Sequence, residues 1–265
     1  MKNNKKKLSV FILALLLIIS SLSICYAENT IYQYSTIDSL LIGNYDGELT
    51  ISQLQTYGDT GLGTFNKLDG EMVFIDGKVF KIRADGKAVE VPPAERTPFA
   101  AAVFFKTDSI LKIDMVDSLK DLNIKVSKTL GSENIFYVIR IDGKFEALKT
   151  RSVPAQKKPY PPLIEVVKKQ SVFKFNNVEG SLIGIKSPAY VKGIGVPGYH
   201  WHFITKDRTA GGHVLNCSFN NLAAKVGTYN YLFLQLPNTT SFLEADLEKN
   251  KEKELKKVEN NPGKD

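Results

Sequence analysis

All three histidines of this chain lie in one short window, at His200, His202 and His213. Neutral imidazole is the commonest nitrogen ligand for transition metals. Residues i and i+2 of a strand point to the same side, so His200 and His202 can aim at one point. The polar stretch 205–212 ends in Gly-Gly and predicts a turn that brings His213 back beside them. Three imidazoles would then converge and leave a fourth position open, as in a catalytic zinc site.

Two charged residues have the chemistry that such a metal needs beside it. Arg151 precedes the rigid exit Ser-Val-Pro, and its guanidinium suits bidentate binding of a carboxylate. Glu71 opens a predicted strand after Asp-Gly, where an inward carboxylate could donate or accept a proton. An ordinary surface arginine and a solvated strand-end glutamate fit these two positions as well. Cys217 would lie about 13 Å along a strand from His213, so we interpret it as a small core residue.

Residues 1–27 have the composition of a secretory signal peptide. Four lysines precede a nearly unbroken apolar run from Leu8 to Ile19, and Cys-Tyr-Ala at 25–27 provides a cleavage site. The run is short for a membrane span, which needs about 20 residues. Ile24 stands where a lipoprotein box has a small residue, which argues against a lipid anchor. We therefore expect a secreted, extracellular protein with no membrane span after cleavage.

Removal of this leader changes the charge and cysteine counts. Without its four lysines, 31 of the 35 basic residues remain against 28 acidic ones, a formal net charge of +3. This near balance does not indicate nucleic-acid binding. Cys217 becomes the only cysteine, so no intramolecular disulfide can form. The expected partner is a small-molecule substrate, and a homodimer is compatible with the sequence.

The elements that must position the site residues are mostly strands. Asp76-Gly77 between two alternating apolar runs predicts a tight hairpin over residues 71–82. Asp142-Gly143 predicts a second hairpin over residues 135–148 in the same way. The glycine-rich stretch 58–65 lacks the lysine and the strand–helix setting of a phosphate loop, and we interpret it as close backbone packing near a site. We also expect a buried strand at 99–105 and helices at 114–122 and 163–169.

An internal similarity suggests two halves. Residues 65–71 resemble residues 175–181, and both segments precede an apolar strand. We therefore expect a mixed α/β (α+β) fold of two tandem domains of similar topology, each built on a mixed sheet. The expected divisions are a signal peptide at 1–27, a sheet domain at 28–158 that carries Glu71 and Arg151, a zinc-binding domain at 159–240, and a charged helix or tail at 241–265. The proline-rich stretch 154–162 is the joint, and the tail is expected to be solvated.

These motifs together resemble the α-acetolactate decarboxylases. The resemblance rests on Gly-Tyr-His200-Trp-His202-Phe, Gly-Gly-His213-Val-Leu, Leu-Asp-Gly-Glu71 and Lys-Thr-Arg151-Ser-Val-Pro, all in family order over the mature chain. It implies that the three histidines bind zinc, that Glu71 and Arg151 lie beside the metal, and that the metal faces the first domain. It further implies that Thr64 lies near the pocket. Some members of the family fold a tail glutamate back to the site, and Glu259 occupies about the matching place.

The resemblance implies a carboxy-lyase that converts (S)-2-acetolactate to (R)-acetoin and CO2. The substrate is a β-keto acid with a hydroxyl between its ketone and its carboxylate. Zinc would chelate the ketone and hydroxyl oxygens and stabilise the enediolate left by CO2. Arg151 would orient the carboxylate, and Glu71 would help to deliver a proton to one face. The substrate's own ketone is the electron sink, so no organic cofactor is expected.

Two other functions fit the same histidines. A three-histidine zinc hydratase or hydrolase would use zinc-bound hydroxide, and CO2 hydration or ester cleavage would reveal it. A secreted metal-binding module without catalysis would close its metal site with a fourth protein ligand. A carboxylate-binding arginine argues against the first of these, and the lack of a fourth histidine argues against the second.

Overall fold

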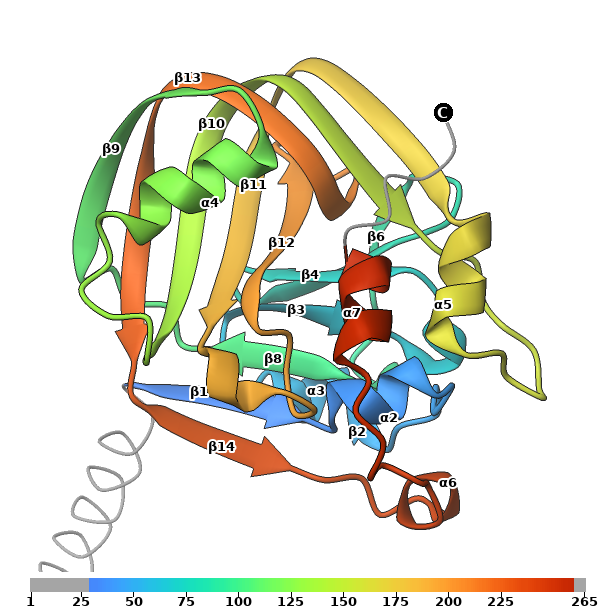
Figure 1. Cartoon of the computed structure of the whole chain (residues 1–265). Coiled ribbons are helices and arrows are strands. Elements are labelled where there is room, and N and C mark those ends of the chain that lie inside the picture. The colour runs from blue at the N-terminus through green and yellow to red at the C-terminus, as the bar shows by residue number, and fades with distance from the viewer. Residues whose placement is uncertain (1–28, 260–265) are drawn as a thin grey trace, which may run out of the picture.

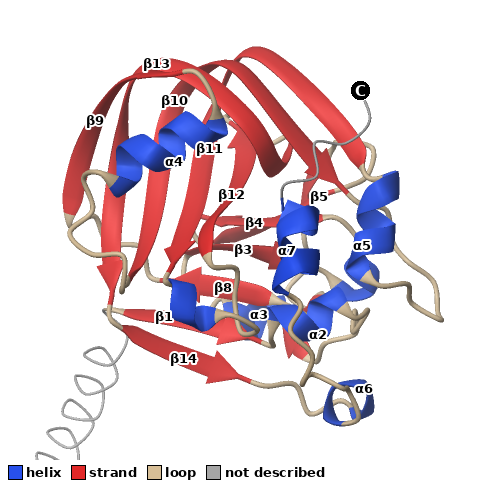
Figure 2. Ribbon diagram, viewed as in Figure 1, coloured by secondary structure: helices blue, strands red, loops and turns tan. Residues whose placement is uncertain are grey.

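The computed structural model describes residues 29–259. The predicted signal peptide and residues 260–265 lie outside this range. No helix within residues 29–259 is long and apolar enough to cross a membrane. The described chain forms two sheets with helices packed around them, so the expected mixture of helices and strands is confirmed (Figures 1 and 2).

The first sheet has seven strands in the order β14-β1-β8-β3-β4-β5-β6. β1 and β14 are parallel and the other neighbours are antiparallel, so this sheet is mixed, as predicted. Its strands are β1 (Thr30–Tyr34), β3 (Thr60–Thr64), β4 (Glu71–Ile75), β5 (Lys78–Ile82), β6 (Ala88–Glu90), β8 (Ala100–Val103) and β14 (Tyr231–Gln235). A separate short ribbon pairs β2 (Leu49–Thr50) with β7 (Arg96–Thr97).

The second sheet has five strands in the order β10-β11-β12-β13-β9, and β10 also pairs with β13. Because β10 pairs with both β11 and β13, the long, curved strands β10 to β13 form a closed ring (Figure 1). All of its pairs are antiparallel, so the prediction of a mixed sheet in the second half is wrong. The strands are β9 (Ser109–Val116), β10 (Phe136–Ser152), β11 (Ser171–Ser187), β12 (Gly198–Thr205) and β13 (Gly211–Tyr229).

The helices are short, and the helix at residues 119–127 packs on the second sheet through Leu122 and Val126. Residues 240–243 form a helix past the end of β14. Two other helices, α5 and α7, lie side by side (Figure 1). The α-helices are α2 (Ile37–Leu41), α3 (Ile51–Leu54), α4 (Leu119–Ser127), α5 (Leu163–Val166), α6 (Thr240–Leu243) and α7 (Glu252–Glu259). The 3-10 helices are η1 (Asn66–Leu68), η2 (Val167–Lys169) and η3 (Ala189–Val191).

The hairpin of β4 and β5 is confirmed, and its turn has the backbone that the sequence predicts. Asp76 and Gly77 have φ values of 53° and 75°, which a two-residue primed turn requires. The strand at 99–105 is confirmed as β8, and the helix after the prolines as α5 and η2. The glycine-rich stretch forms β3, where a Cβ on Gly61 would lie 2.1 Å from the Ala101 carbonyl oxygen. Close backbone packing is therefore why glycine stands there.

The predicted second hairpin is wrong, because β10 runs through Asp142-Gly143 without turning. Gly143 pairs with Gly180 on β11 as part of the continuous ladder. A Cβ on Gly143 would lie 2.4 Å from a methyl of Leu222, so packing is the reason for this glycine. The Asp142 carboxylate accepts hydrogen bonds from Arg140 and from side chains on neighbouring strands. It therefore binds across the sheet and does not bind the main chain of a turn.

Three further expectations change. The predicted helix at 114–122 is wrong in its first half, because β9 continues to Val116 and α4 begins only after the cap Ser118. The internal similarity has no structural counterpart, since residues 66–68 form η1 whereas residues 175–181 lie inside β11. The prolines at 154–162 lead from β10 of the second sheet to α5, and β14 later returns the chain to the first sheet, so the proline stretch does not separate the two sheets.

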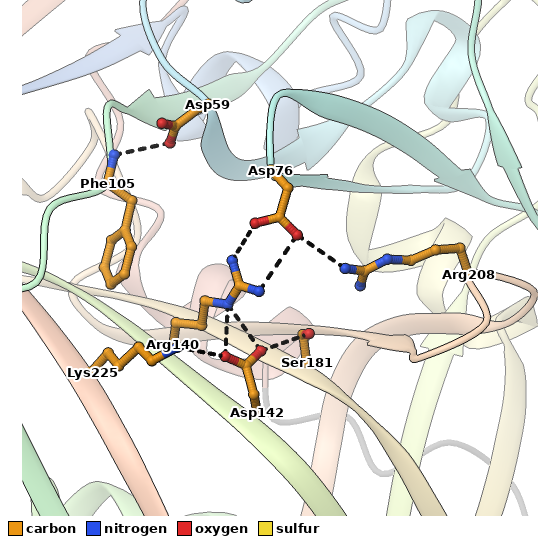
Figure 3. A network of polar contacts seen from close by, with 8 residues as sticks. All are labelled: Asp59, Asp76, Phe105, Arg140, Asp142, Ser181, Arg208 and Lys225. Atoms are coloured by element: carbon orange, nitrogen blue, oxygen red, sulfur yellow. Dashed lines mark hydrogen bonds and ion pairs between the residues drawn. The ribbon is translucent and has the colours of Figure 1, made fainter.

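A polar network joins the two sheets behind the site (Figure 3). Asp76, at the β4–β5 turn, accepts hydrogen bonds from Arg140 on β10 and from Arg208 in the β12–β13 turn. Arg140 also binds Asp142, whose carboxylate contacts Ser181 and Lys225. The Asp76 side chain is about half exposed, so each ion pair is weak by itself. The network nevertheless connects the end of β4 that lies away from Glu71 to β10 and to the β12–β13 turn.

Candidate metal centre and active site

The site is built from two rows of side chains, one on each sheet. In the second sheet, Arg151 on β10 lies opposite His213 on β13, and His213 lies opposite His202 on β12. Directly paired residues project to the same face, so all three side chains point the same way. In the first sheet, Thr64 on β3 lies opposite Glu71 on β4 in the same manner. The two rows face each other across one cavity.

The predicted histidine hairpin is confirmed. His200 Nε2 lies 3.1 Å from His202 Nε2 and 3.1 Å from His213 Nδ1. One ligand nitrogen from each ring falls within 4.8 Å of the others. Ligands about 2.0–2.1 Å from a tetrahedral zinc lie roughly 3.3 Å apart, so the two separations of 3.1 Å are compatible with such an ion. Within residues 29–259, these histidines are the only cluster found with metal-ligand spacing.

The rings are held in the state that binds metal. His202 Nδ1 lies 2.6 Å from the Met72 carbonyl oxygen on β4, so this nitrogen donates and leaves Nε2 free for a metal. Burial and then the positive charge of Arg151 lower the pKa of His200 to about 3. Burial likewise lowers the pKa of His202 and His213 well below the usual value. All three imidazoles are therefore neutral at physiological pH, as a metal requires.

Glu71 and Arg151 meet beside the histidines. Glu71 Oε2 lies 3.6 Å from His202 Nε2, and Glu71 Oε1 lies 4.0 Å from Arg151 Nε. Both residues are buried, with 9 % and 4 % of their surface exposed. Burial raises the pKa of Glu71 to about 7, Arg151 opposes the rise and Glu259 adds to it. Glu71 can therefore hold or release a proton near neutral pH.

Arg151 is fixed at one end and free at another. Its Nη1 donates to the Gln170 side-chain oxygen and to the Val258 carbonyl oxygen, both at 3.0 Å. Its Nε is buried and has no hydrogen-bond partner among the described residues. A buried donor without an acceptor is costly, so the guanidinium is arranged for an acceptor that enters the cavity.

The tail reaches the site, contrary to the expectation that it is solvated. Leu255 and Val258 of α7 are buried, because they pack against a core that includes α2 and α5. Glu259, the last residue of α7, places Oε2 3.7 Å from His213 Nε2 and 4.0 Å from His200 Nε2. Burial raises the pKa of Glu259, against the effect of Arg151. α7 therefore covers the cavity and adds a second carboxylate.

The structure brings all seven predicted site residues together. Thr64 lines the cavity and its hydroxyl donates to the Gly70 carbonyl, which holds the turn before Glu71. Cys217 is buried in the core of the second sheet, as predicted. Sequence reasoning missed Gln170 and the carbonyl groups of Met72 and Val258, and a carbonyl leaves no signal in a sequence. The rest of the cavity wall is apolar and consists of Ile37, Leu40, Leu68, Phe99, Val153, Leu163, Val167 and Val258.

Comparison with known proteins identifies the family of the chain. The sequence model of α-acetolactate decarboxylase matches residues 31–249. The chain belongs to the α-acetolactate decarboxylase family. The Methanosarcina mazei enzyme of this name is 45 % identical over 233 residues, which are 88 % of this chain and 81 % of that protein. The Bacillus subtilis enzyme is 44 % identical over 218 residues, 82 % and 86 % of the two chains.

Solved structures of the family have the same fold. The crystal structure of the Bacillus subtilis α-acetolactate decarboxylase superposes with a TM-score of 0.84 at 42 % identity, covering 89 % of this chain and 100 % of that one. A Staphylococcus aureus protein described as similar to α-acetolactate decarboxylase superposes with a TM-score of 0.80 at 28 % identity, covering 87 % and 97 %. The family match ends at residue 249, so α7 with Glu259 lies beyond it.

Proposed function

We propose that this protein decarboxylates (S)-2-acetolactate to (R)-acetoin and CO2 with a zinc ion on His200, His202 and His213. One observation carries the proposal: in a chain of this family, Glu71 and Arg151 meet the three histidines inside one buried cavity. Zinc bound to these neutral nitrogens would supply a Lewis acid that polarises the substrate's oxygens. Nitrogen-only ligation is the basis for proposing zinc rather than a harder cation.

The cavity matches the two kinds of surface that acetolactate has. The substrate carries a carboxylate, a hydroxyl and a ketone oxygen on one side and two methyl groups on the other. The polar part of the cavity lining consists of Thr64, Glu71, Arg151, His200, His213 and Glu259, and most of the remaining lining is apolar. The apolar wall holds the methyl groups and excludes water, which strengthens the charge interactions inside.

Arg151 binds and orients the substrate carboxylate. Its buried Nε lacks an acceptor among the described residues, and a carboxylate provides one. The bonds from Nη1 to Gln170 and Val258 keep the guanidinium plane in place while the carboxylate is held. When CO2 leaves, the positive charge of Arg151 stays in the cavity beside the electron-rich carbon that needs a proton.

Glu71 holds the proton for that carbon. Its pKa near 7 lets it be protonated in part at neutral pH, and it approaches the site from the first sheet only. Delivery from this one side gives one hand of acetoin, and we propose (R)-acetoin. Glu259 approaches from α7 and completes the acidic side of the cavity. In this scheme, Glu259 is a second group that can hold a proton.

The direct test uses protein purified from residue 28 onward, loaded with zinc and supplied with racemic acetolactate. Chiral gas chromatography measures (R)- and (S)-acetoin as they form. We expect (R)-acetoin well above the uncatalysed rate, loss of this activity with a chelator, and recovery when zinc is added back. The same preparation assayed for CO2 hydration tests the hydratase alternative. If zinc-loaded protein forms no acetoin, or hydrates CO2 instead, the proposal is wrong.

A further inference from the structure

A buried serine hydroxyl joins the two sheets beside the cavity. Ser152 is the last residue of β10, and its Oγ donates to the Ile82 carbonyl oxygen on β5 at 2.6 Å. Both residues have 0 % of their surface exposed, and neither lines the cavity. The two residues are 70 positions apart, so this hydrogen bond fixes one sheet relative to the other. Because it is shielded from water, the bond resists exchange with solvent.

This hydrogen bond lies one residue away from the Glu71–Arg151 contact on both sides. Ile82 is the direct partner of Glu71 in the β4–β5 ladder, and Ser152 follows Arg151 in the chain. Direct partners in such a ladder have Cα atoms about 4.5–5.5 Å apart, and consecutive residues about 3.8 Å. A displacement of Ser152 from Ile82 would therefore also displace Arg151 from Glu71.

Glu71 and Arg151 do not hold each other in place. Glu71 Oε1 lies 4.0 Å from Arg151 Nε, which is too long for a hydrogen bond. The charges attract across this gap, but the attraction has little directional preference and does not define one distance. The separation of the two groups must therefore be set by the segments that carry them.

We propose that Ser152 is a positioning residue that sets the distance between Glu71 and Arg151 by binding the Ile82 carbonyl. This role rests on the proposed function, in which Arg151 holds the substrate carboxylate and Glu71 supplies the proton. Ser152 acts through the two strands and needs no contact with the substrate. Its hydroxyl keeps the proton donor aligned with the carbon that loses CO2.

Two other hydrogen bonds keep the sheets together when the hydroxyl is removed. His202 Nδ1 on the second sheet binds the Met72 carbonyl oxygen at 2.6 Å and orients a predicted metal ligand. Gln156 N, beyond the end of β10, donates to the Lys67 carbonyl oxygen at 2.7 Å. Ser152→Ala should therefore loosen the geometry at Glu71 without separating the sheets or releasing the metal.

The expected kinetic result differs for kcat and KM. In Ser152→Ala, kcat should fall about 10- to 100-fold, because a misplaced proton donor is inefficient. KM should stay within about twofold of the native value, since Gln170 and Val258 still hold the Arg151 guanidinium that binds the carboxylate. A larger share of (S)-acetoin should form, because water can then protonate the opposite face.

The test compares zinc-loaded native protein with two variants of Ser152, using chiral gas chromatography and subtracting the uncatalysed rate. KM and the ratio of (R)- to (S)-acetoin do not depend on how much protein is folded. A purely structural role would therefore lower the rate and leave both quantities unchanged. Ser152→Thr keeps the hydroxyl, and it should restore the native product ratio and most of kcat.

Ser181→Ala is the matched control. Ser181 is also a buried serine of the second sheet, and its Oγ donates to Asp142 at 2.8 Å, outside the cavity lining. The same substitution there removes a hydrogen bond of similar length but leaves the strands beside Glu71 and Arg151 bound to each other. It should keep the native kcat and the native product ratio.

Crystal structures of native protein and Ser152→Ala test the positioning without an activity assay. The distance between the Glu71 carboxylate and the Arg151 guanidinium should change by more than about 0.5 Å, the tolerance of a preorganised site. Native protein that forms no acetoin would refute the proposed function, and these structures would still decide the role of Ser152. An unchanged distance, a native product ratio in Ser152→Ala, no recovery in Ser152→Thr, or an equal loss in Ser181→Ala would each overturn the proposal.

Discussion

The cavity has a wall and a cover, and the two are held in place in different ways. The wall consists of β4, β12 and β13, where strand pairing sets the position of Glu71, His202 and His213. The cover is α7, which has eight residues and is held by two buried side chains, by Arg151 and by an exposed ion pair between Lys192 and Glu252. The wall residues are thus fixed by many cooperative main-chain hydrogen bonds between strands. α7 can move away from the cavity by breaking only a few contacts.

This difference indicates that the wall and the cover have different roles in catalysis. Chemistry that needs a fixed geometry belongs to the wall, since small displacements there cost large factors in rate. The cover can admit substrate by moving and can then exclude water. If this division is right, substitutions in the wall should weaken activity most, those in the cover less, and those in the residues that support them least.

The largest effect is expected from the metal ligands. His202→Ala removes the ligand whose ring is oriented by the Met72 carbonyl. Activity should fall more than about 1,000-fold, since the Lewis acid contributes several kcal/mol to the transition state. Metal analysis should show less than one zinc per chain. Full zinc content with normal activity would remove His202 from the metal site.

Glu71→Gln should lower kcat by about 100- to 10,000-fold, the usual contribution of a positioned acid. The amide keeps the shape but cannot transfer the proton. Zinc content should stay unchanged, which separates proton transfer from metal binding. Glu90→Gln, on exposed β6 of the same sheet, is the matched control and should keep full activity. Equal rates for both variants would contradict the role of Glu71.

Glu259→Gln should have a smaller effect, about 10- to 100-fold, because Glu71 remains in place. Ending the chain after Asn250 removes all of α7 and should lower activity further, since water then enters and Arg151 loses the Val258 carbonyl. Steady-state kinetics on both variants distinguishes the carboxylate from the cover. A truncated chain as active as the native one would show that α7 is not needed.

Gln170→Leu should raise KM several-fold with a smaller change in kcat. The variant frees the Arg151 guanidinium on one side while leaving its charge in the cavity. A charge-assisted hydrogen bond of this kind contributes about 1.5–3 kcal/mol at most. The conservative variant Gln170→Glu should restore binding in part, because it can still accept from Nη1. Unchanged kinetics in Gln170→Leu would show that Val258 alone positions the arginine.

The smallest effect on activity is expected from the polar network around Asp76, which lies outside the cavity lining. Asp76→Asn weakens the network that joins β4 to β10 and to the β12–β13 turn (Figure 3). Because Asp76 is 54 % exposed, the loss in the free energy of unfolding should be at most about 1 kcal/mol, with kcat unchanged. Urea unfolding measures the first and acetoin formation the second. A large drop in kcat would show that the network controls the geometry of the wall.

Local sequence signals worked best where a short segment determines its own structure. The β4–β5 hairpin has a turn that only particular residues adopt, and Asp76 and Gly77 both have positive φ values there. The same signals failed at Asp142-Gly143, where a dipeptide typical of a turn lies in the middle of a long strand. There, contacts with β11 and β13 outweigh the local preference.

The tail shows the same limit. Its charged composition predicts solvation, yet Leu255 and Val258 are spaced for one face of α7 and bury it against α2 and α5. Two apolar residues are too weak a signal to predict docking without knowledge of the groove that receives them. Export of the chain stays a prediction from residues 1–27.

By itself, the sequence determined the histidine cluster and the family, because the spacing of three histidines on a hairpin is a local property and the motifs around Glu71 and Arg151 keep their order along the chain. The tertiary structure alone decided how the two rows meet. Glu71 and His202 are 131 positions apart, and only the packing of one sheet on the other brings their side chains within 3.6 Å. That packing also buries Glu71 and raises its pKa. The orientation of Arg151 and the cover over the histidines depend on α7, whose Val258 carbonyl and docking groove have no signature in a local pattern.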